Sequence, residues 1–566
     1  MLKALPFLQL FHMKNYIAFL MILVHCSFLY AQNQASTWYF GEEAGLHFGK
    51  NAITTLNDGN IKYKEGIACI SDCLGRLLFY TDAVTVWNSS HAVMANGSGL
   101  NGHYSATQGA LIVPQPGDCN LYYIFTVDGK EKSFANGLQF HVVDMNLQNG
   151  SGEIISKNNL LYSLSSEKLT AVRHKNERDY WIVTHLMYSD QFYAYLLTDA
   201  GINSSPVIST AGLPFSNTFD GLGQMKISPG GSRLALVTLV TKRAEVFDFD
   251  DATGIVSNPV TIPSTSFTND GGLYGVEFSP DGSKLYITNH TLDYVNKSGS
   301  LYQIDLLAGN AAGIINSGTV VGSNASSTDL RGLQLGPGGK LYAARSLGKF
   351  LGVVQDPDAK GTACNYTDLG LSLNGQVCNW TLPNFVTSFF REDQPGELQA
   401  KFNTGPACIN KETFFMDESE GDPDEFLWYF GDSTTSTLQH PSHTYNSTGI
   451  YEITLIIRKE CCTDTVRNFI TVEDCFYTAY LPNAFTPNGD GFNDVFQVKG
   501  GGIQSMELVI YNRWGTKLFF SQRPEEGWDG SISGAEAPAG VYAYTLNAGF
   551  KNGEQKKING YVVLFR

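Results

Sequence analysis

Four oxygen-bearing side chains crowd into one short stretch near the end of the chain. The stretch LPNAFTPNGDGFNDVF (481–496) holds Asn488, Asp490, Asn493 and Asp494, and carboxylate and amide oxygens are the ligands that calcium prefers. A full calcium loop would add regularly alternating ligands and a closing glutamate, which this stretch lacks. Asn and Asp also build turns, because they bond to nearby backbone and tolerate left-handed conformations. A turn and a calcium site at these four residues both stay open.

A repeated strand–turn–strand pattern fills the first two thirds of the chain. Three segments align: GQMKISPGGSRLALVT (223–238), GVEFSPDGSKLYITN (275–289) and GLQLGPGGKLYAAR (332–345). Including more divergent copies, the repeats begin near residues 65, 107, 167, 221, 272 and 329, and each is followed by a third strand and often a fourth. Four strands roughly every 40–60 residues is typical of the blades of a β-propeller.

Two leftover segments predict a further blade. STWYFGEEAGLHFGKNAITTL (36–56) offers three strands and LPNFVTSFF (382–390) offers one. We expect the second segment to supply the inner strand and the first the outer three, which gives a seven-bladed propeller over 32–393. Such closure removes exposed sheet edges. An array of β-sandwiches is the alternative fold.

Ligands of propellers bind at the end of the central channel where the inner strands begin. Reading the six copies at this position gives a polar ring of Glu65, Gln108, Lys168, Asp220, Tyr274 and Arg331. This ring predicts recognition of a glycan or a peptide, and solvated channel lining is the plainer alternative. A carboxyl pair such as Glu65 and Asp220 could do acid–base work on a sugar if its separation were suitable. The sequence has no GxSxG, HExxH or GxxxxGK[ST] motif, so we expect no enzyme of those classes.

Composition bounds the class of protein. The chain has 566 residues, of which only 16% are charged and 58 are glycine, which favours short strands and tight turns in three or four domains. The formal net charge is −16. We therefore expect no nucleic acid as a partner, because its binding depends on Lys and Arg neutralising phosphates.

The first residues have the pattern of an export signal. Lys14 precedes the apolar run YIAFLMILV, and the segment ends LYAQ, so we expect a signal peptide over 1–31 and no membrane span in the mature chain. Its removal would leave nine cysteines, which in an exported protein favour disulfides. The pairs expected are Cys364 with Cys378, and Cys408 with Cys461 or Cys462. An odd count leaves at least one thiol.

Two further segments resemble known families. The openings WYFGEEAGLHF and FYTDAVTVWNSSHAVMANGSGL (79–100) resemble N-terminal propeller regions of surface proteins from gliding gram-negative bacteria. Residues 394–474 contain FLWYFGDSTTST and HPSHTYNSTGIYEITLII, which resemble the PKD (polycystic kidney disease) domain, an immunoglobulin-like sandwich. The residues that match its motif include Trp428, Phe430, Gly431, Asp432, Tyr445 and Tyr451. The resemblance implies a spacer or weak binding module with Trp428 in its core.

The last segment, 475–566, resembles the gliding-motility-associated C-terminal domain, the type B sorting domain of the type IX secretion system. ELVIYNRWGTKLFF, GWDG, PAGVYAYTL and GYVVLFR follow the opening cassette in that family's order. The matching residues are Pro487, Asn488, Gly489, Asp490, Gly491, Asn493, Asp494, Asn512, Trp514, Gly515, Trp528, Asp529 and Gly530. The resemblance implies passage through the periplasm and recognition of residues 476–566 by the secretion machinery.

Together these patterns predict an all-β protein: a seven-bladed propeller, a PKD-like sandwich and a C-terminal sandwich for sorting. We expect a secreted or outer-surface protein that binds an extracellular glycan or protein as an adhesin, with no cofactor unless calcium binds. A secreted propeller glycosidase or lyase is the alternative, and a structural part of the gliding apparatus is a third.

Overall fold

The computed structural model describes residues 33–62, 65–267, 271–291, 298–324, 328–391, 398–459 and 462–566. Almost every regular element in these residues is a strand, and α2 (Ala311–Asn316) is a short exception. The expected signal peptide, 1–31, lies outside the described residues. Among the described residues no helix is long and apolar enough to cross a membrane. The fold is therefore all-β, as the composition predicts.

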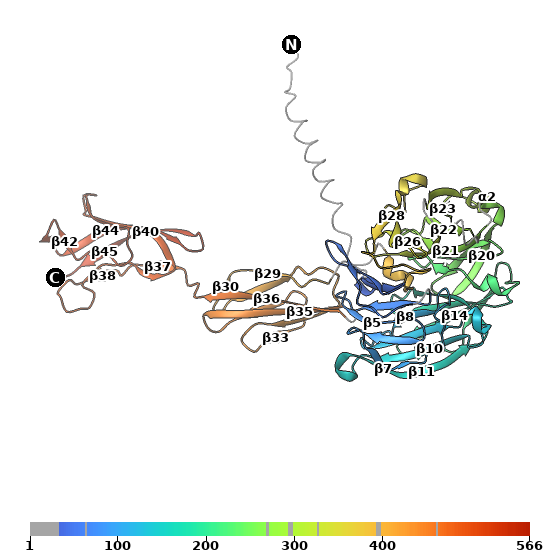
Figure 1. Cartoon of the computed structure of the whole chain (residues 1–566). Coiled ribbons are helices and arrows are strands. Elements are labelled where there is room, and N and C mark those ends of the chain that lie inside the picture. The colour runs from blue at the N-terminus through green and yellow to red at the C-terminus, as the bar shows by residue number, and fades with distance from the viewer. Residues whose placement is uncertain are drawn as a thin grey trace, which may run out of the picture. The chain divides into compact units, whose positions relative to one another are not determined.

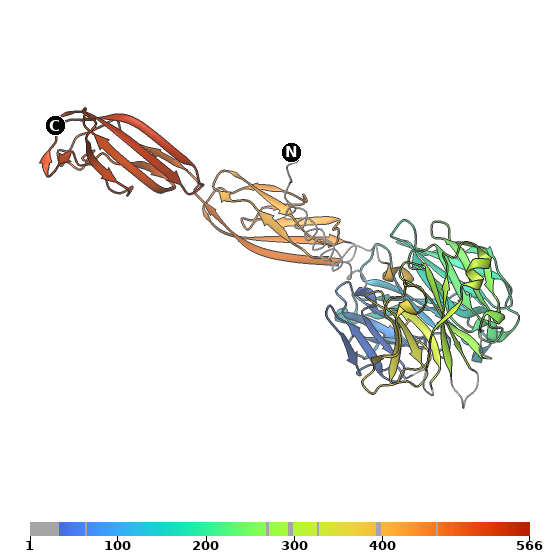
Figure 2. The same ribbon diagram turned by 90° about the horizontal axis from the view of Figure 1, so that it is seen from above.

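The first compact unit is built from consecutive antiparallel sheets (Figures 1 and 2). A three-stranded sheet contains β1 (Thr37–Phe40), β2 (Ala44–Phe48) and β3 (Ile53–Leu56). Two four-stranded units follow. The first holds β4 (Ala68–Ser71), β5 (Leu77–Thr81), β6 (Thr85–Asn88) and β7 (Val93–Ser98). The second holds β8 (Ala110–Pro114), β9 (Leu121–Val127), β10 (Leu138–Asp144) and β11 (Glu153–Tyr162). A single parallel pair, Glu153 with Ala95, joins these two units.

Four more sheets complete the unit. The first holds β12 (Ser165–Arg173), β13 (Tyr180–Leu186), β14 (Gln191–Thr198), β15 (Gly201–Ile202) and β16 (Val207–Thr210). The second holds β17 (Met225–Ile227), β18 (Arg233–Val237), β19 (Ala244–Asp250) and β20 (Ile255–Ile262). The third holds β21 (Gly272–Phe278), β22 (Lys284–His290), β23 (Gly299–Asp305) and β24 (Thr319–Ser323), and the fourth β25 (Leu330–Leu335), β26 (Leu341–Arg345), β27 (Phe350–Val354) and β28 (Tyr366–Ser372).

The first strand of each sheet is the inner one, and neighbouring inner strands contact one another in chain order. β1 contacts β4, β4 contacts β8, and the series continues through β12, β17, β21 and β25. Most residues of these strands are fully buried, because each sheet packs both faces against its neighbours. Sheets of this order around a common axis make a β-propeller.

The predicted inner strand at 382–390 is wrong. In the described structure these residues are extended without strand pairing and end in the 3₁₀ helix η7 (Thr387–Phe390). Pro383 has no N–H to give to a ladder. The Asn384 N–H instead donates to the Ile67 carbonyl (2.9 Å), and its side-chain amide donates to the carbonyls of Leu169 (2.9 Å) and Ala110 (3.3 Å). The segment thus crosses three inner strands, and β1 is the inner strand of the three-stranded sheet.

The PKD-like part pairs a three-stranded sheet with a five-stranded one. The first contains β29 (Phe402–Thr404), β31 (Glu412–Asp417) and β34 (Ser442–Thr444). The second contains β30 (Ala407–Cys408), β36 (Cys462–Glu473), β35 (Gly449–Lys459), β32 (Glu425–Tyr429) and β33 (Thr435–Ser436). Trp428 is fully buried, and its indole N–H donates to the Leu438 carbonyl (2.9 Å), so its predicted core position is confirmed.

The cysteine pairing of this domain differs from the prediction. Cys408 is bonded to Cys475, at the far end of the domain, rather than to Cys461 or Cys462. β30 runs parallel to the end of β36, which brings Cys408 opposite Glu473 and hence near Cys475. The predicted Cys364–Cys378 pair is also wrong, because both residues are buried thiols.

The C-terminal domain is a separate sandwich. Its main sheet has the order β38 (Ala484–Phe485), β45 (Gln555–Leu564), β44 (Gly540–Phe550), β40 (Ile503–Tyr511) and β41 (Lys517–Ser521). Two small pairs complete it, β37 (Thr478–Tyr480) with β39 (Lys499–Gly501), and β42 (Ser531–Ile532) with β43 (Ala535–Glu536). Trp528 fills its core, and the Arg566 guanidinium donates to the Gly530 carbonyl (2.8 Å).

Candidate functional site

The structure places all six residues of the predicted ring inside the propeller, where each is at most 9% exposed. Three of them, Glu65, Tyr274 and Arg331, come together. The Tyr274 hydroxyl donates to Oε1 of Glu65. The Arg331 guanidinium lies 5.5 Å from the centre of the Tyr274 ring and 4.4 Å from that of Trp380. The three side chains of this cluster are packed against one another.

The other three residues of the ring support the fold. The Lys168 ammonium donates to the carbonyls of Leu222, Gly223 and Val237 at 2.7–2.8 Å, and burial lowers the pKa of this lysine to about 7. The Gln108 side chain donates to the Met225 carbonyl (2.9 Å) and accepts from the Met225 N–H (2.7 Å), so it ties two inner strands together.

Asp220 lies in a helix cap. It closes the capping box of η4 (Thr218–Gly221) with Asn217. Its carboxylate accepts from the N–H of Ser216 (2.8 Å) and the hydroxyl of Thr241 (2.6 Å). Burial raises the pKa of Asp220, but these hydrogen bonds outweigh it and hold the pKa below its usual range. Acid–base work by Glu65 together with Asp220 stays a prediction.

A second buried carboxyl, Glu167, lies close enough to Glu65 to raise its pKa. Its Oε2 accepts from both the N–H and the hydroxyl of Thr107 (2.8 Å each), and its Oε1 accepts from the Lys130 N–H (2.9 Å). Burial raises the pKa of Glu167 to about 7. The sequence offered only a weak signal for it, because Glu167 is adjacent to Lys168, which occupies the ring position in the repeat.

Glu65 and Glu167 influence each other. Burial, and then the nearby Glu167 charge, raise the pKa of Glu65 well above its usual range, against the opposing charge of Arg331. The Ser105 hydroxyl lies 3.3 Å from Oε2 of Glu65 and 3.2 Å from Oε1 of Glu131. These three glutamates form what we call the carboxyl cluster. Negative charges that lie close together repel each other, so a carboxyl group in such a cluster tends to keep its proton.

Exposed aromatic rings lie at the same end of the propeller. We call this end the mouth face. It holds the loops that precede the inner strands. Because neighbouring strands of a sheet run in opposite directions, the β9–β10 loop lies at this end as well. Tyr104 precedes β8 and Phe219 precedes β17, and these side chains are 42% and 39% exposed. Tyr104 stacks on His103, with ring centres 4.7 Å apart. The Lys130 ammonium lies 4.2 Å from the centre of the Phe219 ring.

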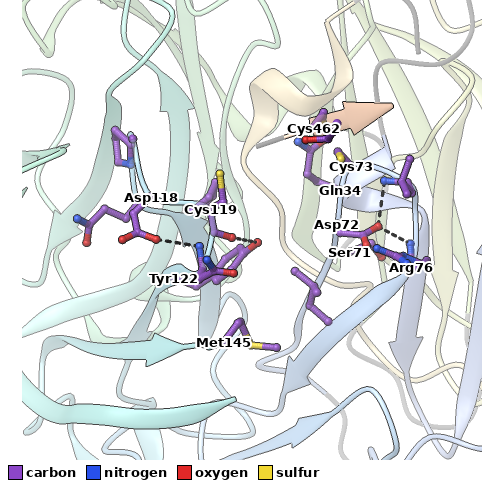
Figure 3. Close-up of a pocket in the computed structure, with 18 of the residues that line it drawn as sticks. Gln34, Ser71, Asp72, Cys73, Arg76, Asp118, Cys119, Tyr122, Met145 and Cys462 are labelled. Atoms are coloured by element: carbon purple, nitrogen blue, oxygen red, sulfur yellow. Dashed lines mark hydrogen bonds and ion pairs between the residues drawn. The ribbon is translucent and has the colours of Figure 1, made fainter. Parts of the chain in front are cut away.

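The opposite face carries a pocket of about 570 Å³ (Figure 3). The β4–β5 and β8–β9 turns line it, together with residues 462 and 463, which group with the first compact unit. Figure 3 shows Cys73, Cys119 and Cys462 on its wall, with Asp72 bonded to Arg76 (2.7 Å). Sequence reasoning did not single out this pocket.

The oxygen-rich cassette of the last domain forms a hydrogen-bonded turn. Oδ1 of Asp494 accepts from the Gly489 N–H (2.7 Å) and its Oδ2 from the Gly491 N–H (2.8 Å). The Asn488 amide donates to Asp490 (2.9 Å), whose other oxygen accepts from the Phe492 N–H (2.8 Å). Within the described residues no group of three or more His, Cys, Asp and Glu side chains is placed to hold a metal ion. Calcium at the cassette stays a prediction.

Two family matches assign the domains after the propeller. Residues 479–564 match the CHU_C type IX secretion signal domain, and residues 403–473 match the PKD domain. The chain carries a type IX secretion signal domain. This domain directs the protein to the cell surface or the extracellular space and implies handling by the secretion machinery. The domain order predicted from the motifs thus agrees with both matches.

Comparison with solved structures gives the following similarities. A protein from Lactobacillus plantarum is 14% identical over 62% of this chain and 98% of its own, with a TM-score of 0.38. A candidate 6-phosphogluconolactonase from Bacteroides uniformis is 12% identical over 60% and 98%, with a TM-score of 0.36. The PKD1 domain of a Vibrio cholerae metalloprotease is 26% identical over 13% of this chain and 96% of its own, with a TM-score of 0.13. No curated protein matches the chain.

Proposed function

We propose that this secreted protein binds an extracellular glycan at the mouth face of its propeller and serves as a surface adhesin. The observation that carries the proposal is the pairing of exposed rings with carboxylates at one end of the fold. Tyr104 and Phe219 are exposed there, and the carboxyl cluster lies beneath them. Flat rings supply apolar area that a sugar ring can cover, and the exposed carboxylate of Glu131 can accept hydrogen bonds from the hydroxyl groups of the sugar.

The charge of the protein narrows the class of glycan. A formal net charge of −16 repels acidic polymers, and the exposed carboxylate of Glu131 at the mouth face adds to this repulsion. Neutral polysaccharides and polysaccharides with amino sugars therefore fit better than uronates or sulfated chains. The aromatic rings also suit a protein ligand.

Affinity electrophoresis of the full chain against neutral, amino and acidic polysaccharides tests this proposal. We expect retardation in a neutral or amino polysaccharide and none in an acidic one. Binding restricted to a protein of the cell surface would replace the glycan ligand, and retardation in acidic polysaccharides alone would contradict the charge argument.

A glycosidase or lyase is the second candidate, and one observation favours it. Glu65 and Glu167 are both buried carboxyls whose pKa values are raised, as a proton donor's would be. Release of reducing ends from any polysaccharide that binds, abolished in Glu65→Gln, would establish turnover and overturn a role in binding alone. Binding without released ends would leave adhesion as the function.

A further inference from the structure

The pocket opposite the mouth face brings together cysteines that are far apart in the sequence. Cys73 lies in the β4–β5 turn, and Cys462 is the first residue of β36. Both line the pocket, and Figure 3 shows them beside each other on one wall. Their thiol groups are hydrogen-bonded to each other. Cys119, on the same pocket, is already disulfide-bonded.

The two thiols differ from the other thiols of the described residues. Cys69, Cys364 and Cys378 are buried, and burial raises the pKa of Cys69 and of Cys378 to about 12. Cys73 and Cys462 are half-buried and open to the pocket. The hydrogen bond from Cys462 lowers the pKa of the Cys73 thiol despite its partial burial. The thiolate is the reactive form of cysteine, so accessibility and acidity both favour reaction at Cys73.

We propose that Cys73 and Cys462 are a redox pair that closes to a disulfide after export, and that a small-molecule or protein disulfide entering the pocket is the oxidant. The Cys73 thiolate attacks one sulfur of the oxidant, which forms a mixed disulfide and releases one thiolate. Cys462 then loses its proton and attacks the Cys73 sulfur, which releases the second thiolate. Two cysteine thiols become one disulfide, and the oxidant is reduced to two thiols.

The surroundings of the pair suit this exchange. The pocket volume of about 570 Å³ admits an oxidant the size of a short peptide disulfide. Arg76, held by its ion pair with Asp72 (2.7 Å), and Arg178 also line the pocket. Arg76 lowers the pKa of the Cys73 thiol and Asp72 raises it, so the hydrogen bond from Cys462 is what favours the thiolate. The new bond would tie the turn of residues 72–76 to residues 462–464, which belong to the same compact unit.

Peptide mapping of the full-length protein tests the pair. The protein, collected from the culture medium and alkylated before digestion with trypsin, should yield peptide 65–76 linked to peptide 460–467. We expect the link to disappear in Cys73→Ser and in Cys462→Ser and to persist in the matched control Cys69→Ser. A link that persists in Cys462→Ser, or full alkylation of both cysteines even after incubation with oxidised glutathione, would overturn the proposal.

A rate measurement covers the case in which a variant fails to fold. In the reduced wild-type protein, Cys73 should react with iodoacetamide at least about ten times faster than Cys69, because it is both more exposed and more acidic. Equal rates at the two positions would contradict the assignment of Cys73 as the attacking group.

Discussion

The backbone N–H of Lys130 donates a 2.9 Å hydrogen bond to the buried carboxyl of Glu167. The ammonium of the same lysine lies 4.2 Å from the centre of the exposed Phe219 ring. One residue therefore joins the carboxyl cluster to the surface that we propose binds a ligand. A change in the charge of Glu167 should therefore shift the position of Lys130 and of its ammonium at the mouth face.

The raised pKa of Glu167 predicts a pH-dependent stability. Burial raises this pKa to about 7, so the folded protein holds the proton over a range in which the unfolded chain has lost it. The free energy of unfolding should therefore fall as the pH rises from the ordinary glutamate pKa toward 7. Thermal unfolding between pH 5 and 8 should show a smaller fall in Glu167→Gln than in the wild type. The exposed Glu42→Gln is the control, and a fall as large in Glu167→Gln as in the wild type would contradict the assignment.

The segment that crosses the inner strands should stabilise the propeller. Asn384→Ala removes the side-chain hydrogen bonds to the carbonyls of Leu169 and Ala110 and leaves both buried. Loss of partners for buried polar groups costs about 1–3 kcal/mol each, so we expect the free energy of unfolding in urea to fall by about 2–4 kcal/mol. The exposed Asn146→Ala should change it by less than about 0.5 kcal/mol. Equal effects of the two substitutions would show that the crossing segment contributes no stability.

The Cys408–Cys475 disulfide should stabilise the PKD-like domain. The bond closes a loop with a sequence separation of 67, for which the chain-entropy estimate is about 4 kcal/mol. Cys408→Ser and Cys475→Ser should lower its free energy of unfolding by similar amounts, and the double variant should be no less stable than either single one. Additive losses would mean that each cysteine acts through packing rather than through the bond.

Substitution of two tryptophans of the secretion domain by alanine should affect its stability to very different extents. Trp528 is fully buried, and its indole N–H donates to the Ser531 carbonyl (2.8 Å), whereas Trp514 is 84% exposed. Trp528→Ala should cost about 3–5 kcal/mol of domain stability and Trp514→Ala less than about 0.5 kcal/mol. Circular dichroism melts of the full chain check both. A large loss in Trp514→Ala would contradict its exposed position.

Sequence patterns located most of the strands but not the contacts across the axis. Alternating apolar residues and Pro-Gly or Asp-Gly turns are local signals, so the starts of the inner strands at Met225, Gly272 and Leu330 fall close to the predicted repeats. The placement of the segment around Asn384 was not predicted, because its hydrogen bonds reach Ala110 and Leu169, more than 200 residues away in the sequence. No local pattern encodes such a partner.

The candidate site was predicted only in part for a similar reason. Glu65, Tyr274 and Arg331 share one position of the repeat and meet in space. Lys168 and Asp220 share that position too. The Lys168 ammonium, however, is hydrogen-bonded to backbone carbonyls, and the Asp220 carboxylate caps the helix η4. Glu167 sits one residue away from the ring position, and only burial among Thr107 and Lys130 distinguishes it.

The measurement that tests the account most directly is the dissociation constant of the full chain for the polysaccharide that binds best, compared between Phe219→Ala and Leu307→Ala. Both side chains are exposed, but Phe219 lies on the mouth face and Leu307 follows β23 on the opposite face. We predict that Phe219→Ala weakens binding at least about tenfold, as loss of an aromatic anchor does, and that Leu307→Ala leaves it unchanged. Unchanged binding in Phe219→Ala, or equal losses in both variants, would contradict a glycan site at the mouth face.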